Sequence, residues 1–303
     1  MLTTIQQAAK LIADGNALIV AGEEELLQSL RAATGLAGRI PYFMTEHGGV
    51  TSREQLFIEQ VPAIAVASRI RIYNGTEIAQ VGVNAPERGY SLLIIPAFSR
   101  LHHDYALHAP HYPELFFKVI AGWIAGVHLD DVNVRAPAVF HGPSGAKYTQ
   151  EAVALEVQLP ADHAATLGIV NIFEQGAGDQ LVFTASGFAI DECLVNGVRH
   201  NFHDYLLRVG VDVRLPLIAD FCGTMINVGI QSVDAKTRRV QLYAPVFEDV
   251  IYRFAKPIGD YSACFAAAIP AHVRNPAFAC NCVLNYLYGS LEGRSAGAHR
   301  RSP

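Results

Sequence analysis

The feature that most constrains the fold is an alternation of helix-like and strand-like segments at the start of the chain. Apolar residues recur at helical spacing through residues 1–14, and Asp14-Gly15-Asn16 then predicts a turn. The short apolar run at 17–21 predicts a buried strand, and a second helix is expected at 23–33. Because helices alternate with short buried strands, the sequence predicts a mixed α/β fold with helices packed on mixed β-sheets.

The rest of the chain adds further short elements. Residues 92–96 are wholly apolar, as expected of a central strand, and Asn74-Gly75 predicts a hairpin between strands at 63–73 and 77–83. Helices are also expected at 114–123 and 202–209. Other strands are predicted at 138–140, 152–157, 167–172, 180–186, 189–195, 215–219, 226–232, 240–245, 260–268 and 277–286.

Composition and charge argue against several classes of protein. Hydrophobic residues make up 51% of the chain and charged residues 17%, so a sizeable core is available and disorder is not expected over most of the length. The net charge of -5 offers no broad positive field to nucleic acid or anionic lipid. No apolar run reaches the roughly 18 residues of a membrane helix. The five cysteines at irregular spacing, without a secretory signal pattern, favour reduced thiols in the cytoplasm.

No internal repeat or low-complexity linker is evident in the sequence. A boundary near Leu159-Pro160 is the most natural division. It gives one lobe at 1–159 and a second at 160–294, which we expect to pack intimately around one core. Residues 295–303 are expected to form a disordered tail.

The densest group of potential ligands lies between Ser99 and Tyr112, a segment expected to be a loop. It contains His102, His103, Asp104, His108 and His111. The four imidazoles could bind a transition metal or haem iron, and the carboxylate could orient one of the rings. Their spacing matches no closed structural metal site, so the alternative is that these residues line a ligand pocket or make loop hydrogen bonds.

Two glycine-containing turns are further candidates. Glu46 and His47 precede a glycine pair, where they could act as an acid and a base on a ligand or simply form a turn. The loop at 175–179 is only loosely similar to a phosphate-binding loop, because it lacks the lysine and the following Ser or Thr of that motif.

The cysteines leave two interpretations open. Asp220 and Cys222 follow a predicted strand, a position where α/β proteins often bind ligands. Cys280 and Cys282 lie two apart in a predicted buried strand, so both thiols should share one face and pack in the core. Alternatively, Cys222 or Cys282 could be a nucleophile with a histidine base.

Four stretches resemble the FIST sensory domain family of bacterial signal-transduction proteins. They are AVFHGPSGAKYTQEAVALEV at 138–157, FTASGFAIDECLVNGVRHNFHDYL at 183–206, VRLPLIAD at 213–220 and FACNCVLNYLYGSLEG at 278–293. The first 60 residues depart from the family's pattern. The resemblance implies a two-lobed ligand-binding sensor, and some members of that family sense nitric oxide through haem. Because this sequence contains no kinase, cyclase or transmitter module, the resemblance also implies a separate signalling partner.

Three functions therefore remain open. The favoured one is a cytoplasmic, stand-alone sensor or small-ligand-binding protein of FIST type, with haem or a transition metal as an optional cofactor. The second is a cofactor-independent hydrolase or transferase that uses a cysteine nucleophile. The third is a subunit of a larger assembly or a homo-oligomer, for which the low charge content would supply apolar faces. Neither nucleic acid nor a membrane is expected as a partner.

Overall fold

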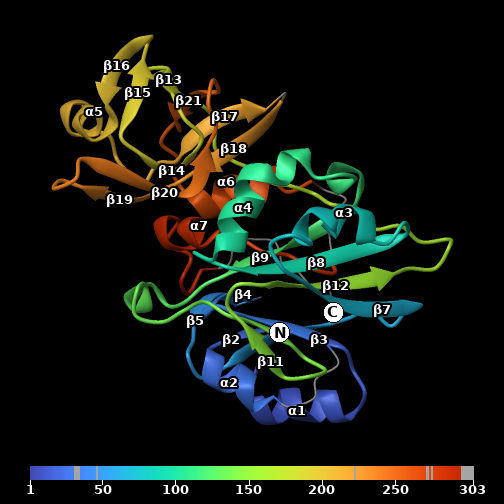
Figure 1. Ribbon diagram of the computed structural model, residues 1–303. Helices are drawn as coiled ribbons and strands as arrows, with labels where there is room; N and C mark the ends of the chain where they lie inside the picture. The colour runs from blue at the N-terminus through green and yellow to red at the C-terminus, as the bar shows by residue number, and fades with distance from the viewer. Residues whose placement is uncertain (31–34, 46, 222, 271–272, 274–275, 295–303) are drawn as a thin grey trace. The chain divides into compact units, whose positions relative to one another are not determined.

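The computed structural model describes residues 1–30, 35–45, 47–221, 223–270, 273 and 276–294 (Figure 1). They fall into two compact units. Unit 1 comprises the described residues of Met1–Ile169, His272–Tyr286 and Leu291–Pro303, and unit 2 those of Val170–Ala271 and Leu287–Ser290. The division thus follows Ile169, beyond the expected boundary, and part of the C-terminal region returns to unit 1. The expected tail at 295–303 lies outside the described residues.

Unit 1 contains two main sheets and a hairpin. Sheet I has the spatial order β1 (Leu2–Thr3), β6 (Leu56–Gln60), β2 (Leu18–Gly22), β3 (Gly35–Arg39), β10 (Val139–His141) and β11 (Ala146–Tyr148). Sheet II has the order β7 (Ala67–Tyr73), β12 (Ala152–Gln158), β8 (Gly89–Pro96) and β9 (Ile120–Ala125). The hairpin consists of β4 (Tyr42–Thr45) and β5 (Gly48–Thr51). The main helices are α1 (Ile5–Ala13), α2 (Glu24–Ser29), α3 (Val81–Asn84) and α4 (Arg100–His108).

The two sheets stack face to face, with helices on both outer faces (Figure 1). Ile19 of sheet I shares a core with Leu92 and Ile94 of sheet II. Alternate residues of the same strands point outwards, because side chains alternate between the two faces of a strand. Leu18 and its neighbours therefore pack against α1 and α2, while Leu93 packs beneath α3 and α4. Unit 1 is thus a four-layer α/β/β/α structure, which agrees with the expected fold class.

Sheet I and sheet II share one topology. In each, two parallel strands are joined through a helix: β2 and β3 through α2, and β8 and β9 through α4. In sheet I, the antiparallel strand β6 lies beside β2, and β1 lies on the other side of β6. In sheet II, the antiparallel strand β12 lies beside β8, and β7 lies on the other side of β12. The order β1-β6-β2-β3 thus corresponds to β7-β12-β8-β9. The structure contains a topological repeat where the sequence shows none.

Unit 2 is built from two antiparallel sheets. The larger has the order β16 (Val198–Asn201), β15 (Glu192–Val195), β13 (Leu181–Phe183), β21 (Ile251–Phe254), β17 (Leu217–Phe221) and β18 (Thr224–Val228). The smaller has the order β14 (Gly187–Ile190), β20 (Arg239–Val246) and β19 (Ile230–Asp234). Helix α5 (Phe202–Val209) contributes Phe202, Tyr205 and Leu206 to the core between them. Helix α6 (Tyr261–Ala268) also belongs to this unit.

Several predicted elements are confirmed. The first helix is α1, where Thr4 and Gln7 form a capping box. The central strand expected at 92–96 is β8, which pairs on both sides. Helix α5 begins and ends where the sequence predicts, because Asn201 caps it and Gly210 ends it with φ of 65°. The Asn196-Gly197 turn joins β15 and β16 as a hairpin.

Other predictions are wrong, and local hydrogen bonds explain most of them. No hairpin forms at Asn74-Gly75, because the Asn74 side chain accepts hydrogen bonds from the backbone of Thr76 and Glu77 and starts a helical segment. The expected loop at 99–112 is largely α4, which begins at the Ser99 cap. The helix expected at 114–123 is a short 3-10 helix, Leu115–Phe117, followed by the start of strand β9, whose apolar residues pair with β8.

The C-terminal segments also differ from the prediction. The strand expected at 260–268 is α6, whose alanine-rich sequence favours a helix that Asp260 caps. The strand expected at 277–286 is irregular and then helical, as α7 (Val283–Tyr288). The strand expected at 167–172 is absent from the described residues there.

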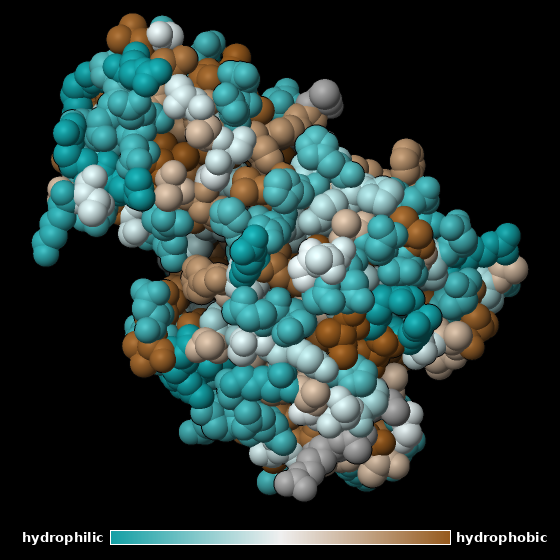
Figure 2. All heavy atoms as spheres, viewed as in Figure 1, coloured by the Kyte–Doolittle hydropathy of each residue, from teal (hydrophilic) through white to brown (hydrophobic). Residues whose placement is uncertain are grey.

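The large apolar side chains that are exposed among the described residues come mostly from separate segments. None of the helices in the described ranges is long and apolar enough to cross a membrane. On the visible side, apolar residues lie among polar ones (Figure 2). The most exposed large apolar side chains are Phe117, Val134, Ile169 and Phe116, which come from separate segments apart from the two phenylalanines. Scattered exposed residues of this kind are ordinary on a globular protein.

The parallel pairing of β8 with β9 depends on Gly122. Its φ is 146°, and a Cβ atom would lie 1.8 Å from the carbonyl oxygen of Leu93. We expect Gly122→Ala to lower the free energy of unfolding by about 3 kcal/mol or more, because backbone atoms would have to move. Urea unfolding followed by the fluorescence of Trp123, the single tryptophan, measures this in unit 1.

The matched control is Gly75→Ala. No atom lies within 4 Å of a Cβ at that turn position, so the change should stay within about 0.5 kcal/mol. Equal unfolding midpoints for the two variants would contradict the close approach of β8 and β9.

Candidate functional site

The residues that follow strands β2, β3 and β9 meet at one end of unit 1. Strand β2 is parallel to β3 in sheet I, and β9 is parallel to β8 in sheet II. Glu23 directly follows β2, and Arg39 is the last residue of β3. The backbone N–H of Gly126, just after β9, donates to the carbonyl oxygen of Arg39 at 2.8 Å, so the ends of β3 and β9 lie together. Ligands of α/β proteins commonly bind beyond the carboxyl ends of parallel strands. This end of unit 1 is therefore a candidate ligand-binding region.

A buried ion pair lies at this end. The Arg39 side chain is fully buried, and that of Glu23 is 3% exposed. Glu23 Oε2 accepts from Arg39 Nε at 2.8 Å and lies 2.6 Å from Arg39 Nη2. Glu23 Oε1 is buried and has no hydrogen-bond partner among the described residues. Removing two charges from water is costly, and a carboxylate oxygen left without a donor adds to that cost.

Local structure explains how the pair forms. Glu23 occupies the N-cap position of α2, and its carbonyl oxygen accepts from the N–H groups of Leu26 and Leu27. A carboxylate at a helix N-terminus is favoured by the helix dipole. Arg39 lies on the strand next to β2, and its register partner is Gly22, which precedes Glu23. Parallel pairing of β2 and β3 therefore brings the two charges together.

Further charges surround Arg39. Arg39 Nη1 lies 3.8 Å from Glu24 Oε2, and Arg39 Nη2 lies 3.8 Å from Asp131 Oδ2. Arg39 Nη1 also donates to the carbonyl oxygen of Ala136 at 3.4 Å. Arg135 pairs with Glu25 and thereby fixes the far end of the same loop. The segment after β9 is thus attached to β3 and α2 by charges of both signs.

The accessible edge of the cluster is one ion pair. Arg53 Nη1 donates to Asp131 Oδ2 at 2.7 Å, and the Arg53 side chain is 44% exposed. The hydrogen bond from Arg53, together with the charges of Arg135 and Arg39, lowers the pKa of Asp131 below its ordinary value. Asp131 is therefore a carboxylate at neutral pH. A ligand would meet a cation and an anion side by side.

Aromatic rings form another part of this edge. The Tyr42 ring of β4 stacks on the His128 ring with centroids 5.6 Å apart. Tyr42 also meets Tyr286 at a tilt, and its hydroxyl oxygen accepts from the Leu129 N–H at 3.0 Å. Burial raises the pKa of Tyr42 above its ordinary value. We call the six side chains of this region the Arg39 site: Glu23, Arg39, Tyr42, Arg53, His128 and Asp131.

The histidines predicted to bind a metal do not gather at one point. His102, His103 and His108 lie on α4, and His111 lies on the following 3-10 helix, Ala109–His111. Residues share a helix face when they are three or four apart, and none of the three histidines on α4 is so spaced. Among the described residues, no group of three or more His, Cys, Asp or Glu side chains could hold a metal ion.

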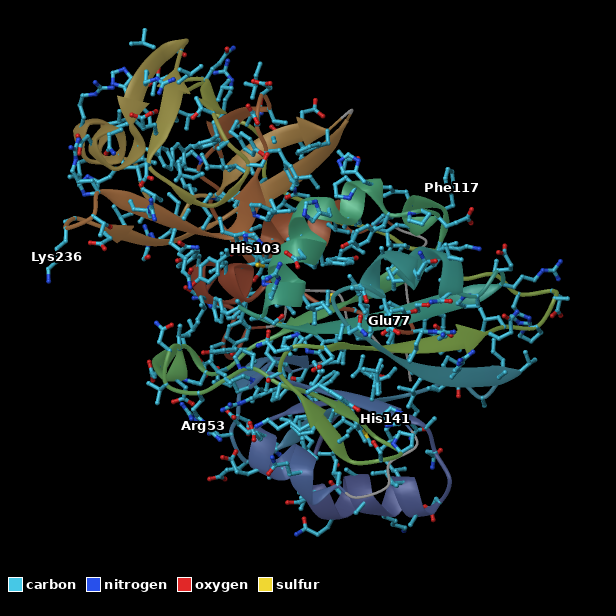
Figure 3. All side chains as sticks on the ribbon, viewed as in Figure 1. Arg53, Glu77, His103, Phe117, His141 and Lys236 are labelled. Atoms are coloured by element: carbon cyan, nitrogen blue, oxygen red, sulfur yellow. The ribbon has the colours of Figure 1, made fainter. Side chains whose placement is uncertain are left out.

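Helix α4, which carries three of the histidines, occupies a position in sheet II equivalent to that of α2 at the Arg39 site. Helix α4 follows β8 as α2 follows β2, so the two occupy equivalent positions in the topological repeat. Burial, with the neighbouring His103, lowers the pKa of His102. Asp104 accepts from Arg100 at 3.4 Å and lies 3.6 Å from His103. Figure 3 shows His103 on α4, apart from Arg53 at the Arg39 site.

The other predicted site residues form turns or lie outside the described residues. Glu46 and Cys222 are in the latter group. The exposed His47 lies in the turn between β4 and β5, where its N–H donates to Thr45 Oγ1. Asp220 Oδ1 accepts from the Gly223 N–H in the turn between β17 and β18. Asp220 belongs to unit 2, whereas His47 and helix α4 belong to unit 1.

The paired cysteines are not in a strand. Cys280 and Cys282 are exposed, which contradicts the expected core packing. The thiol of Cys280 lies 3.4 Å from the carbonyl oxygen of Gly122. Of the four cysteines that the structure describes, Cys193 packs in a core, where burial raises its pKa to about 12. A thiol with such a pKa is a poor nucleophile at neutral pH.

Sequence reasoning missed the Arg39 site. In the sequence, Glu23 predicts only the start of a helix, and no motif includes Arg39. The one available signal was a charged residue inside an otherwise apolar stretch at 35–44. Arg53 and Asp131 lie in polar segments, where nothing in the sequence distinguishes them from other surface charges.

Comparison with known proteins identifies a family without assigning an activity. Residues 3–301 match a family described as a family of unknown function, DUF6976, and the chain belongs to that family. No curated protein and no solved structure matches the chain. The FIST resemblance therefore stays a prediction.

The buried ion pair predicts an asymmetric response to mutation. Arg39→Met should lower the free energy of unfolding by about 3–5 kcal/mol, because it leaves the Glu23 carboxylate buried without its cation. The double variant Glu23→Leu/Arg39→Met should recover most of that loss. Trp123 fluorescence in urea measures both, and the exposed Arg199→Met is the control. A double variant no more stable than Arg39→Met would contradict this account.

The Asp131 carboxyl provides a pH test of the exposed pair. Because Arg53 holds the pKa of Asp131 below its unfolded value, the stabilisation is present above that value and is lost as the pH falls through the lowered pKa. We expect Arg53→Gln to raise the pKa of Asp131 towards the ordinary range. A carbon-detected NMR titration of the carboxyl group measures it, and an unchanged pKa would show that the pair does not persist in solution.

Proposed function

We propose that the protein binds a small polar ligand at the Arg39 site and acts as a cytoplasmic sensor that signals through a separate protein. The observation that carries the proposal is the buried Arg39–Glu23 pair, with an unsatisfied carboxylate oxygen, where the parallel strands end. Buried charges are expensive, so they are often kept for function and not for stability. The resemblance to sensory domains supports the same proposal.

The exposed edge indicates what kind of ligand would fit. Arg53 can bind a carboxylate, and Asp131 can bind a cationic group, since the two already pair with each other at 2.7 Å. The stacked Tyr42 and His128 rings offer a flat surface beside them. A small molecule that carries both charges would exchange one ion pair for two. We therefore favour a zwitterionic or similarly polar metabolite over an apolar one.

The surroundings supply a way to report occupancy. Asp131 follows β9, Arg53 follows β5, and Arg39 contacts the first of these segments through Asp131 and Ala136. A ligand that separates Arg53 from Asp131 would change the contacts of the 126–136 segment with the sheet. Such a change in a surface loop is the kind of signal that a separate partner can recognise.

A thermal-shift screen tests this function. The probes are amino acids, nucleotides, sugar phosphates and organic acids, tested on the full chain. We expect at least one polar compound to raise the melting temperature of the wild type, and the shift to disappear in Arg53→Gln and Asp131→Asn, because both variants remove one half of the exposed pair.

The control is Arg199→Gln, another exposed arginine with one carboxylate partner, Glu192 at 2.8 Å in unit 2. It should keep the full shift. The proposal fails if no compound stabilises the protein, or if the shift of every stabilising compound persists in Arg53→Gln.

A further inference from the structure

Unit 2 contains a hollow of its own, formed entirely by described residues. Its volume is about 470 Å³, and it lies between the 177–179 loop, helix α5 and strand β21. The loop belongs to the glycine-containing segment at 175–179, which is loosely similar to a phosphate-binding loop and is not part of the Arg39 site.

The polar wall of the hollow is fixed. Asp179 Oδ1 accepts from Asn196 Nδ2 at 2.7 Å, and Asp179 Oδ2 accepts from the Tyr205 hydroxyl at 3.2 Å. Burial and the nearby Asp179 raise the pKa of Tyr205 to about 12, so the phenol stays a donor. The side chain of Gln175 donates to the carbonyl oxygen of Ile218 and anchors the start of the loop. This wall therefore needs little rearrangement to meet a ligand.

Arg253 is the cation of the hollow, and it forms no ion pair with a carboxylate of the described residues. Within the described residues, its guanidinium group makes one hydrogen bond, from Nη1 to the carbonyl oxygen of Gly178. Arg238 and Arg239 of the same unit differ, because they pair with Asp204 and Asp191. The remaining N–H groups of Arg253 can thus bind an anion, and a guanidinium fork suits a carboxylate.

The rest of the lining limits the class of anion. Val209, Val211 and Phe254 supply apolar surface beside Arg253. Asp179 places a negative charge in the same hollow, which disfavours a dianion such as phosphate more strongly than a monoanion. We propose that unit 2 binds a small monocarboxylic acid with an apolar tail, held by Arg253 and packed on these side chains.

Calorimetric titration of the full chain with 4-methylpentanoate tests the site. We expect the wild type to bind the probe, and Arg253→Gln to weaken binding at least about ten-fold, because the charge-assisted hydrogen bonds are lost. Arg253→Lys should give an intermediate affinity, since it keeps the charge but not the fork. Circular dichroism checks that both variants fold.

Two controls separate this site from the Arg39 site. Arg199→Gln and Arg53→Gln should both keep the wild-type affinity for 4-methylpentanoate. No detectable binding at about 10 mM probe, or equal affinity in Arg253→Gln, would overturn the proposal. Competition by inorganic phosphate as strong as that by the carboxylate would overturn the assignment of a monocarboxylic acid.

Discussion

The face-to-face packing of sheet I on sheet II is the constraint on which the rest of unit 1 depends. Ile19, Leu92 and Ile94 share its core, so each parallel strand has one face buried by the other sheet and the other covered by helices. Strands buried on both faces are short and continuously apolar. In these parallel strands the charged residue, Arg39, is at a strand end. The Arg39 site lies where the ends of β3 and β9 come together.

The same constraint explains which parts of the fold were predictable. Strand β8 has a clear local signal, which is an uninterrupted apolar run. Helix α5 has three: an N-cap residue, apolar residues on one helix face and a glycine that ends the helix. The β9 segment has the same apolar composition as a buried helix, and only pairing with β8 decides between the two. The 99–112 segment has little apolar pattern, so its sequence predicts a loop, but the Ser99 cap starts helix α4 there.

The candidate site was less predictable than the fold. Clustered histidines in a sequence suggest a metal site because imidazole is a common metal ligand. On helix α4, however, His102, His103 and His108 are not three or four residues apart, so they do not share one helix face. Arg39 and Glu23 are 16 residues apart, and they meet only because β2 and β3 are parallel neighbours. A sequence pattern records spacing along the chain, whereas this pair depends on strand register. The topological repeat was hidden for a related reason, since two sheets can share an order of strands without sharing residues.

Arg39 and Arg253 differ in whether their charge is available to a ligand, because one is buried in an ion pair and the other is not. Arg39 is fully buried and held by Glu23, so it organises the strand ends and leaves ligand contact to Arg53 at the edge. Arg253 lines a hollow, and its one hydrogen bond within the described residues is to a carbonyl group, so most of its capacity to donate remains. An arginine without a carboxylate partner gains more from an incoming anion than one that must first break an ion pair. The site in unit 2 should therefore accept a simple anion, whereas the Arg39 site requires a ligand that satisfies both Arg53 and Asp131.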